Sequence, residues 1–169
     1  TSGFSANADL EWAFPSPLGF AWGEREFVQV TADGLWNMLA LWNHSLAVRG
    51  HVMQSFGPEA APPQRWTLLG GPGTLPTLEQ GELRGDNVVF FESTYAVPLA
   101  FVALPVVGIP ELAARHAVGS AWVSDGETPR WQQNLALGLR VRMADLFLYL
   151  DPAADDRDPH FSVGFTLPR

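Results

Sequence analysis

The sequence predicts an all-β fold, a single jelly-roll β-barrel or sandwich of about eight strands with one or two short helices. Turn-forming pairs such as Asp33-Gly34 and Asp151-Pro152 recur roughly every ten residues, and runs rich in Val, Phe, Trp, Leu and Thr lie between them. The length of 169 residues suits one domain with its own core. We therefore expect residues 1–169 to form a single β-barrel domain, with 1–22 as a candidate N-terminal arm.

The expected strands lie between the turn signals. In chain order they are Glu26–Thr31, Arg65–Leu69, Asn87–Tyr95, Leu99–Val107, Ala117–Ser124, Leu135–Arg142, Leu146–Leu150 and His160–Leu167. The clearest alternation runs from Leu135 to Met143, where every second residue is Leu, Val or Met. A period of two places these side chains on one face, which we expect to meet the core, and places Arg140 and Arg142 on the other.

Two segments carry helical signals. Apolar residues recur at helical spacing within 35–48, after a candidate cap at Asp33, yet the same residues also alternate as a strand would. Both readings stay open. The segment Pro110–His116 has Pro at the first helical position and Gly119 beyond its end, so it predicts one short helix between strands.

The first 22 residues differ from the rest in their pattern. Large aromatic residues, among them Phe4, Trp12 and Trp22, are spread among turn-forming residues. Such a segment is expected to pack as an arm, either on its own barrel or on a neighbour's.

The composition predicts an apolar surface. Charged residues make up only 17% of the chain, apolar residues reach 47%, and there are seven tryptophans. Because a domain of this size has too much surface to hide all its apolar side chains, we expect an oligomer or assembly subunit. A net charge of −8, with no lysine and scattered arginines, argues against a nucleic-acid partner.

The longest apolar run, 96–109, is interrupted by Pro98, Pro105 and Gly108. Since a membrane helix needs about 20 apolar residues, we expect a soluble chain with no membrane span. The beginning of the sequence shows no basic and apolar leader pattern, which is compatible with a chain without a signal peptide or with one already removed.

The stretch Gly70-Gly71-Pro72-Gly73-Thr74 tests a nucleotide-binding hypothesis. It begins like a phosphate-binding loop, but Leu75 and Pro76 stand where that loop needs Gly and Lys, and the chain contains no lysine. The pattern therefore indicates a stiff turn between strands, exposed at one end of a barrel, where a neighbouring subunit is a better candidate partner than a nucleotide.

Other signatures of chemistry are missing from the sequence. The four histidines (His44, His51, His116 and His160) show no metal-binding spacing, no Gly-x-Ser-x-Gly elbow occurs, and there is no cysteine. The acidic cluster Asp151–Asp158 lacks the spacing of a calcium-binding loop. We predict no catalytic, cofactor-binding or metal-ligating residues, no cofactor and no enzymatic activity.

As a profile, the chain resembles the small single-jelly-roll major capsid proteins of tailless, membrane-containing icosahedral bacteriophages of Thermus. The likeness rests on length, strand count, the Thr1 start, a basic set made of arginine alone and low charge. It implies a virion location, self-association, a second capsid protein as partner and an internal membrane nearby. We therefore expect a capsid protein that builds the shell through lateral β-barrel contacts. The alternative is a carbohydrate-binding β-sandwich that uses exposed tryptophans.

Overall fold

A computed structural model describes residues 2–13, 26–39, 43–58, 60–101, 108–124, 126, 128–141 and 144–152, and the backbone of 160–165. Eight strands form the main sheet: β1 (Gly3–Ala13), β2 (Phe27–Leu39), β3 (Ser45–Phe56), β6 (Asn87–Pro98), β7 (Glu111–Trp122), β8 (Gln132–Val141), β9 (Ala144–Leu150) and β10 (His160–Phe165). A second sheet contains the short strands β4 (Thr67–Leu69) and β5 (Leu83–Gly85).

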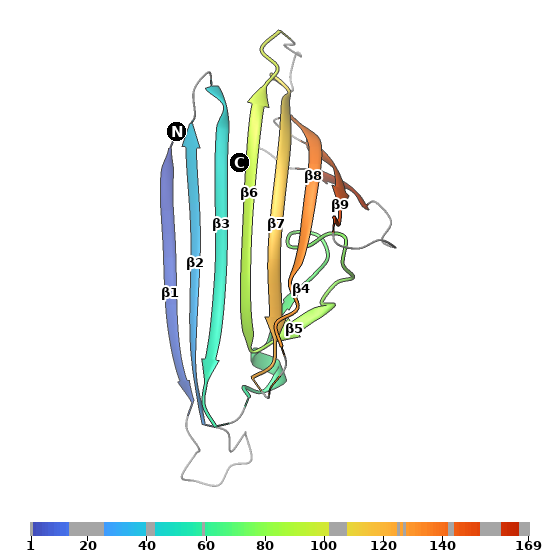
Figure 1. The fold of residues 1–169 in the computed structure, drawn as a ribbon. Helices are drawn as coiled ribbons and strands as arrows, with labels where there is room; N and C mark the ends of the chain where they lie inside the picture. The colour runs from blue at the N-terminus through green and yellow to red at the C-terminus, as the bar shows by residue number, and fades with distance from the viewer. Residues whose placement is uncertain are drawn as a thin grey trace.

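The predicted all-β class is confirmed, and the connectivity is simple. Every strand of the main sheet pairs antiparallel with its neighbours in the order β1-β2-β3-β6-β7-β8-β9-β10. Figure 1 shows β1, β2, β3, β6 and β7 side by side, with successive arrows pointing in opposite directions. This order is a meander, without the Greek-key crossovers of a jelly roll among the described strands. Its two edge strands are β1 and β10.

The helix expected at Pro110–His116 is wrong, because Glu111–Trp122 is a strand paired with β6 on one side and β8 on the other. Of its two alanines, Ala113 is buried on one face of the sheet and Ala114 is exposed on the other. Residues 35–39 and 45–48 are strand as well, and 40–42 lie outside the described residues. A short 3-10 helix spans Pro63–Arg65, and no described helix is long and apolar enough to cross a membrane.

The described part of the N-terminal segment packs on the sheet of its own chain. Gly3–Ala13 pairs along its whole length with β2 of the same chain, from Gly3 opposite Asn37 to Ala13 opposite Phe27. The first half of the segment is therefore an edge strand of the sheet, and 14–22 lie outside the described residues. Most of the expected strand Leu99–Val107 lies outside them too.

The strand register sorts the side chains of the main sheet onto two different faces, because residues directly opposite each other point the same way. One face, called the polar face below, carries every charged residue of β1–β3 and β6–β9: Asp9, Glu11, Asp33, Arg49, Glu92, Glu111, Arg115, Arg140 and Asp145, together with His51.

The other face, called the apolar face below, carries no charged residue in these strands. Its large side chains are Phe4, Leu10, Trp12, Val28, Val30, Trp36, Met38, Leu46, Val48, Val52, Phe56, Val89, Phe91, Tyr95, Val97, Leu112, Val118, Trp122, Leu135, Leu137, Leu139, Val141, Leu146, Leu148 and Leu150.

An insert between β3 and β6, residues 57–86, forms a second layer on the polar face. It contains the β4–β5 hairpin, which lies beside the lower part of β7 (Figure 1). Its buried leucines pack against the main sheet in one cluster: Met53, Leu69, Leu75, Leu78, Leu83, Val88, Phe90, Ala117 and Ala121. At roughly 1.5–3 kcal/mol for each fully buried Leu or Phe, this cluster is the principal apolar contribution to the stability of the insert.

The core therefore lies on the side of the sheet that also carries the charges. A second buried cluster follows it on the same face toward β9: Ala96, Ala113, Ala136, Phe147 and Tyr149. The alternation from Leu135 to Val141 is confirmed, but the side expected to meet the core is the opposite one. Leu135, Leu137 and Leu139 are exposed, and their small neighbour Ala136 is buried.

Candidate functional site: a bare apolar face and the polar network behind it

The apolar face is uncovered in the described part of the chain. Phe4, Leu10 and Trp12 on β1 are 74%, 73% and 66% exposed, and leucines on β8 and β9 are about half exposed. Apolar side chains at these positions are too many and too continuous to be scattered surface residues.

The extent of this face can be estimated from strand geometry. At about 4.8 Å between strands and about 3.3 Å per residue, seven strands of ten or so residues cover on the order of 1,200 Å². The largest apolar patch on an ordinary monomer is roughly 300–600 Å². The face is therefore large enough to require a covering surface.

Most aromatic residues of the apolar face lie near the two ends of the strands. At the end where β1, β3 and β7 finish lie Trp12, Phe56 and Trp122. Phe4 and Tyr95 lie toward the opposite end, where β1 begins and β6 finishes. Between its two aromatics β1 carries Ala6, Ala8 and Leu10, whereas Phe91 of β6 and His116 of β7 lie in the middle of the face farther along the sheet.

The few polar side chains of the apolar face carry no permanent charge. They are Gln54, Asn87, Ser93, His116, Ser120 and Gln133. Asn87 is satisfied inside the protein, because its side chain donates to Asp86 Oδ1 and Ser124 Oγ, each at 2.8 Å.

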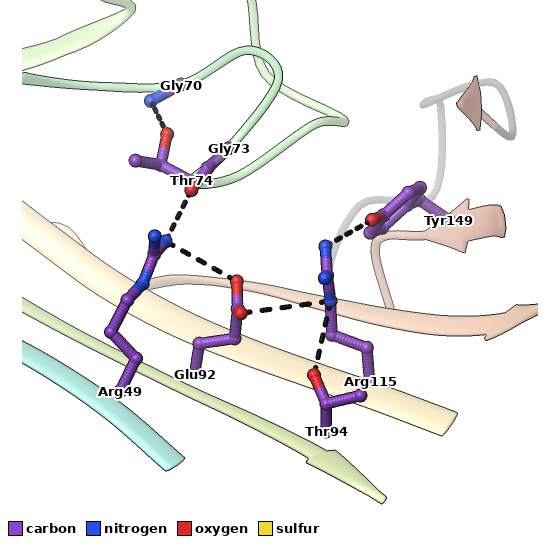
Figure 2. Close-up of polar contacts among 8 residues, drawn as sticks. All are labelled: Arg49, Gly70, Gly73, Thr74, Glu92, Thr94, Arg115 and Tyr149. Carbon is purple, nitrogen blue, oxygen red and sulfur yellow. Dashed lines mark hydrogen bonds and ion pairs between the residues drawn. The ribbon is translucent and has the colours of Figure 1, made fainter. Parts of the chain in front are cut away.

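The polar face holds an extended charge network (Figure 2). Glu92 lies between two arginines, with Arg49 Nη2 at 3.5 Å and Arg115 Nε at 3.8 Å. Arg115 also donates to Thr94 Oγ1 at 3.3 Å and to the Tyr149 hydroxyl at 2.7 Å. The network thus joins β3, β6, β7 and β9 through side chains.

Each of the two arginines of the network also packs against an aromatic ring. The Arg115 guanidinium lies 4.9 Å from the centre of the Phe147 ring, and that of Arg49 lies 5.1 Å from the Phe90 ring, both within cation–π range. Burial raises the pKa of the Tyr149 hydroxyl above its ordinary value of 10.0, and the charge and hydrogen bond of Arg115 oppose that rise. Tyr149 is therefore a neutral hydroxyl that accepts from an arginine.

His51 forms a separate pair on the same face. Its Nδ1 lies 2.7 Å from Asp33 Oδ1 on the neighbouring strand, and its Nε2 is buried without a partner. The residues directly opposite His51 on its two sides are Asp33 and Phe90. A carboxylate that orients a histidine occurs in catalytic triads, but here no hydroxyl or thiol bonds Nε2, so the geometry supports a structural pair.

The glycine-rich stretch forms a closed turn above this network. Gly70 N–H donates to Thr74 Oγ1 at 2.9 Å, Gly71 N–H to the carbonyls of Leu75 and Leu78, and Thr74 N–H back to Gly71. These donors, which would have to face a phosphate in a nucleotide-binding loop, are used within the turn. The Gly73 carbonyl accepts from Arg49, so the turn is fastened to the polar face (Figure 2).

Asp86 anchors the end of the insert. The residue is fully buried, and its carboxylate accepts from Ala61 N–H, Ser124 N–H and Oγ, and Asn87 Nδ2 at 2.8–3.0 Å. Nothing in the sequence pattern singled out this residue. An aspartate before an asparagine and an apolar run is an ordinary turn signal, and two of its three donor residues, Ala61 and Ser124, are distant in the chain.

Side chains of the insert contact strands in both the N-terminal and the C-terminal half of the main sheet. Arg65 pairs with Glu11 of β1 at 2.8 Å, and Thr77 exchanges two hydrogen bonds with the buried Asn134 of β8. The insert therefore lies across six strands of the polar face, from β1 through β2, β3, β6 and β7 to β8.

The sequence-derived candidates are dispersed. His44 contacts the Tyr95 hydroxyl, His116 lies on the apolar face, and His51 pairs with Asp33. Arg140 is 3.9 Å from Glu111, whereas Arg142 and the acidic residues 155–158 lie outside the described residues. Within the described ranges, no three His, Asp or Glu side chains cluster as metal ligands do.

The charge-free face and the aromatic residues near its ends are set by the pairing register of the strands. Sequence alternation indicated part of the charge-free face in 135–143 and, as one of two readings, in 35–48. The chain matches no protein-family model and no curated protein.

Proposed function

We propose that this chain is a structural assembly protein that acts by burying its apolar face against a second apolar surface. The observation that supports the proposal is the complete segregation of charge: every Asp, Glu and Arg of β1–β3 and β6–β9 lies on the polar face. At about 25 cal/mol per Å², covering even half of a face of this size contributes on the order of 15 kcal/mol before the entropy of association is subtracted.

The finer form of the proposal is a virion capsid subunit. In that form the covering surface is a neighbouring subunit, a second capsid protein completes the shell, and an internal membrane lies beneath it. The long exposed edge strand β1 supports lateral contacts of this kind, because its outer backbone groups can pair with a strand of another chain.

The test compares the wild-type chain with a variant whose apolar face is made polar. Val30, Val52, Phe91 and Leu137, on four different strands, are all replaced by Thr, which keeps β propensity while removing apolar surface. In detergent-free buffer we expect the wild type to form oligomers or precipitate, and the variant to be a folded monomer by light scattering and circular dichroism. A wild-type chain that is a stable, folded monomer in water contradicts the proposal.

A carbohydrate-binding function is favoured by one separate observation. A cleft of about 610 Å³ lies where the β5 strand meets the end of β7, and it is lined by Trp66, Glu82, Arg84, Thr128 and Arg130 among others. An indole beside charged and hydroxyl groups suits a sugar ring. Binding of glycans that is abolished by Trp66→Ala would support this function, and silence on a glycan array would reject it.

A further inference from the structure

We infer that the outer edge of β1 pairs antiparallel with β1 of a second copy of this chain, about a two-fold axis that passes through Ala8. This inference rests on the proposed function, which calls for a lateral partner, and it names that partner and its register. Three features of the described strands support it: an edge without protection, a strand that is complementary to itself, and an apolar face that the pairing would continue.

β1 lacks the devices that proteins use to protect a sheet edge. Among the described strands it pairs on one side alone, with β2. Natural edge strands are kept from pairing by Pro, by Lys, by a bulge or by short length. β1 has 11 residues, GFSANADLEWA, with no Pro and no Lys. Its pairing with β2 runs from Gly3 opposite Asn37 to Ala13 opposite Phe27 without a skipped residue, so this strand contains no bulge.

The symmetry of such a pair fixes how the two faces lie. Two copies that pair the same strand antiparallel are related by a two-fold axis perpendicular to the sheet. This axis keeps both apolar faces on the same side, because residues directly opposite each other point the same way. Each register is therefore defined by the residue that lies opposite its own copy.

The two carboxylates of β1 exclude the registers centred on the second half of the strand. A register centred on Asp9 or Glu11 puts that carboxylate directly opposite itself, and one centred on Leu10 puts Asp9 opposite Glu11. Like charges directly opposite each other destabilise a sheet. The axis is therefore expected to lie before Asp9.

A register centred on Ala8 pairs all 11 residues of β1 and matches their polar side chains. On the polar face, Ser5 lies opposite Glu11 and Asn7 lies opposite Asp9. In each pair a hydroxyl or amide donor meets a carboxylate acceptor. The two-fold axis makes both pairs occur twice, so the polar side of this edge is complementary to itself.

The same register also matches the apolar side chains of β1. Phe4 lies opposite Trp12, and Ala6 lies opposite Leu10. Phe4 and Trp12 are 74% and 66% exposed in the single chain, and an aromatic pair across two strands stabilises a sheet. Moving the centre to Asn7 places Phe4 opposite Leu10 and loses the aromatic pair.

The pairing would join two apolar faces into one wider face. Eleven residues at about 3.3 Å each make a contact strip about 36 Å long and one strand wide. A contact this narrow belongs with transient interfaces of less than about 1,200 Å². The edge pairing is therefore weak by itself, and burial of the joined apolar faces holds the copies together. A variant whose apolar face is made polar is accordingly a monomer in dilute solution.

Single cysteines can report which positions of β1 meet, because the chain contains no cysteine of its own. Ala8→Cys and Ala6→Cys are matched, since both replace an alanine on the apolar face of the same strand. In the Ala8 register, two copies of position 8 have Cα atoms about 4.5–5.5 Å apart, which a disulfide can bridge, whereas two copies of position 6 are about 14 Å apart.

The first experiment oxidises each concentrated variant under mild conditions and measures disulfide-linked dimers by non-reducing gel electrophoresis. We expect Ala8→Cys to form dimers and Ala6→Cys to form about tenfold fewer or less. Circular dichroism checks that both variants are folded. Equal cross-linking of the two variants would overturn the inference.

A second pair of cysteines separates edge pairing from stacking of the apolar faces. Asn7→Cys and Asp9→Cys place their thiols on the polar face, where stacked apolar faces cannot bring them together. When the two variants carry tags of different length and are mixed and oxidised, we expect the heterodimer, because position 7 of one copy lies opposite position 9 of the other. Homodimers of Asn7→Cys in its place, or no cross-linked product, would overturn the inferred pairing.

The outcomes separate this inference from the proposed function. A wild-type chain that forms oligomers in water, while Ala8→Cys cross-links no better than Ala6→Cys, overturns the edge pairing and leaves the assembly function standing. A wild-type chain that is a folded monomer by light scattering, while Ala8→Cys still cross-links selectively, overturns the burial of the apolar face and supports the edge pairing as a transient contact.

Discussion

Arg115 holds the polar network together, because its side chain reaches both Glu92 on β6 and Tyr149 on β9. Replacing it with Met keeps most of the stem and removes the charge. We expect Arg115→Met to destabilise the protein by about 2–3 kcal/mol, since half-buried Glu92 loses a partner and Tyr149 loses its donor. Urea unfolding followed by tryptophan fluorescence measures this.

Arg140→Met is the matched control, because Arg140 and Glu111 are 3.9 Å apart and both are more than a third exposed. A surface pair of this kind contributes less than about 1 kcal/mol. If the two variants lose equal stability, the network is not a structural support.

Tyr149 makes the free energy of unfolding depend on pH in the alkaline range. Burial raises the pKa of its hydroxyl above 10.0, so the folded chain keeps the proton after the unfolded chain has released it. The stability contribution is complete below pH 10 and falls as pH rises from there through the folded-state pKa. We expect Tyr149→Phe to reduce this alkaline loss, as measured by urea midpoints across pH and by tyrosinate absorbance. An unchanged pH slope in the variant would contradict the assignment.

At the scale of single elements, Gly138 allows β8 and β9 to approach closely. A Cβ at this position would lie 2.2 Å from the Leu146 carbonyl oxygen and 2.5 Å from Phe147 Cδ1. We expect Gly138→Ala to cost about 3 kcal/mol or more, because backbone on β9 must move. Gly34→Ala on β2 meets nothing within 4 Å, so it should be neutral or slightly stabilising. Thermal unfolding of the two variants tests the contrast.

The stability of the insert depends on the hydrogen bonds that Asp86 accepts, and not on its charge alone. Its two oxygens accept four hydrogen bonds from Ala61, Asn87 and Ser124. In Asp86→Asn one oxygen becomes a donor that faces other donors, and we expect a loss of about 2–3 kcal/mol with protease cleavage appearing within 57–86. Glu79→Gln, at an exposed position of the same insert, should leave the cleavage pattern unchanged. Equal resistance of Asp86→Asn and wild type would refute the anchoring role.

What could be predicted from the sequence differs between elements. Alternation over 135–143 correctly placed the leucines on one face and Arg140 on the other, because a period of two needs only local information. It could not say which face meets the core, since that depends on where the insert packs. Pro110–His116 failed as a helix because strand pairing on both sides outweighs the helix propensity of its two alanines.

At the scale of the whole molecule, the composition correctly indicated exposed apolar surface, and the charge pattern shows where it lies. Alternation hides this surface from a reading of the sequence, because apolar residues at every second position leave no long apolar run. The all-β class was predictable, whereas the meander order and the Asp86 anchor come from contacts between residues far apart in the chain.

The meander has a kinetic consequence. Nearly every pairing joins strands that follow each other along the chain, so most of the sheet can form by short loop closures. The pairing of β3 with β6 is different, because the chain must first bring its ends together across the insert of residues 57–86. This seam divides the sheet into an N-terminal three-stranded unit and a C-terminal five-stranded unit. We expect the two units to form early and independently, and their joining, fastened by Asp86 and the buried leucines of the insert, to set the rate of folding.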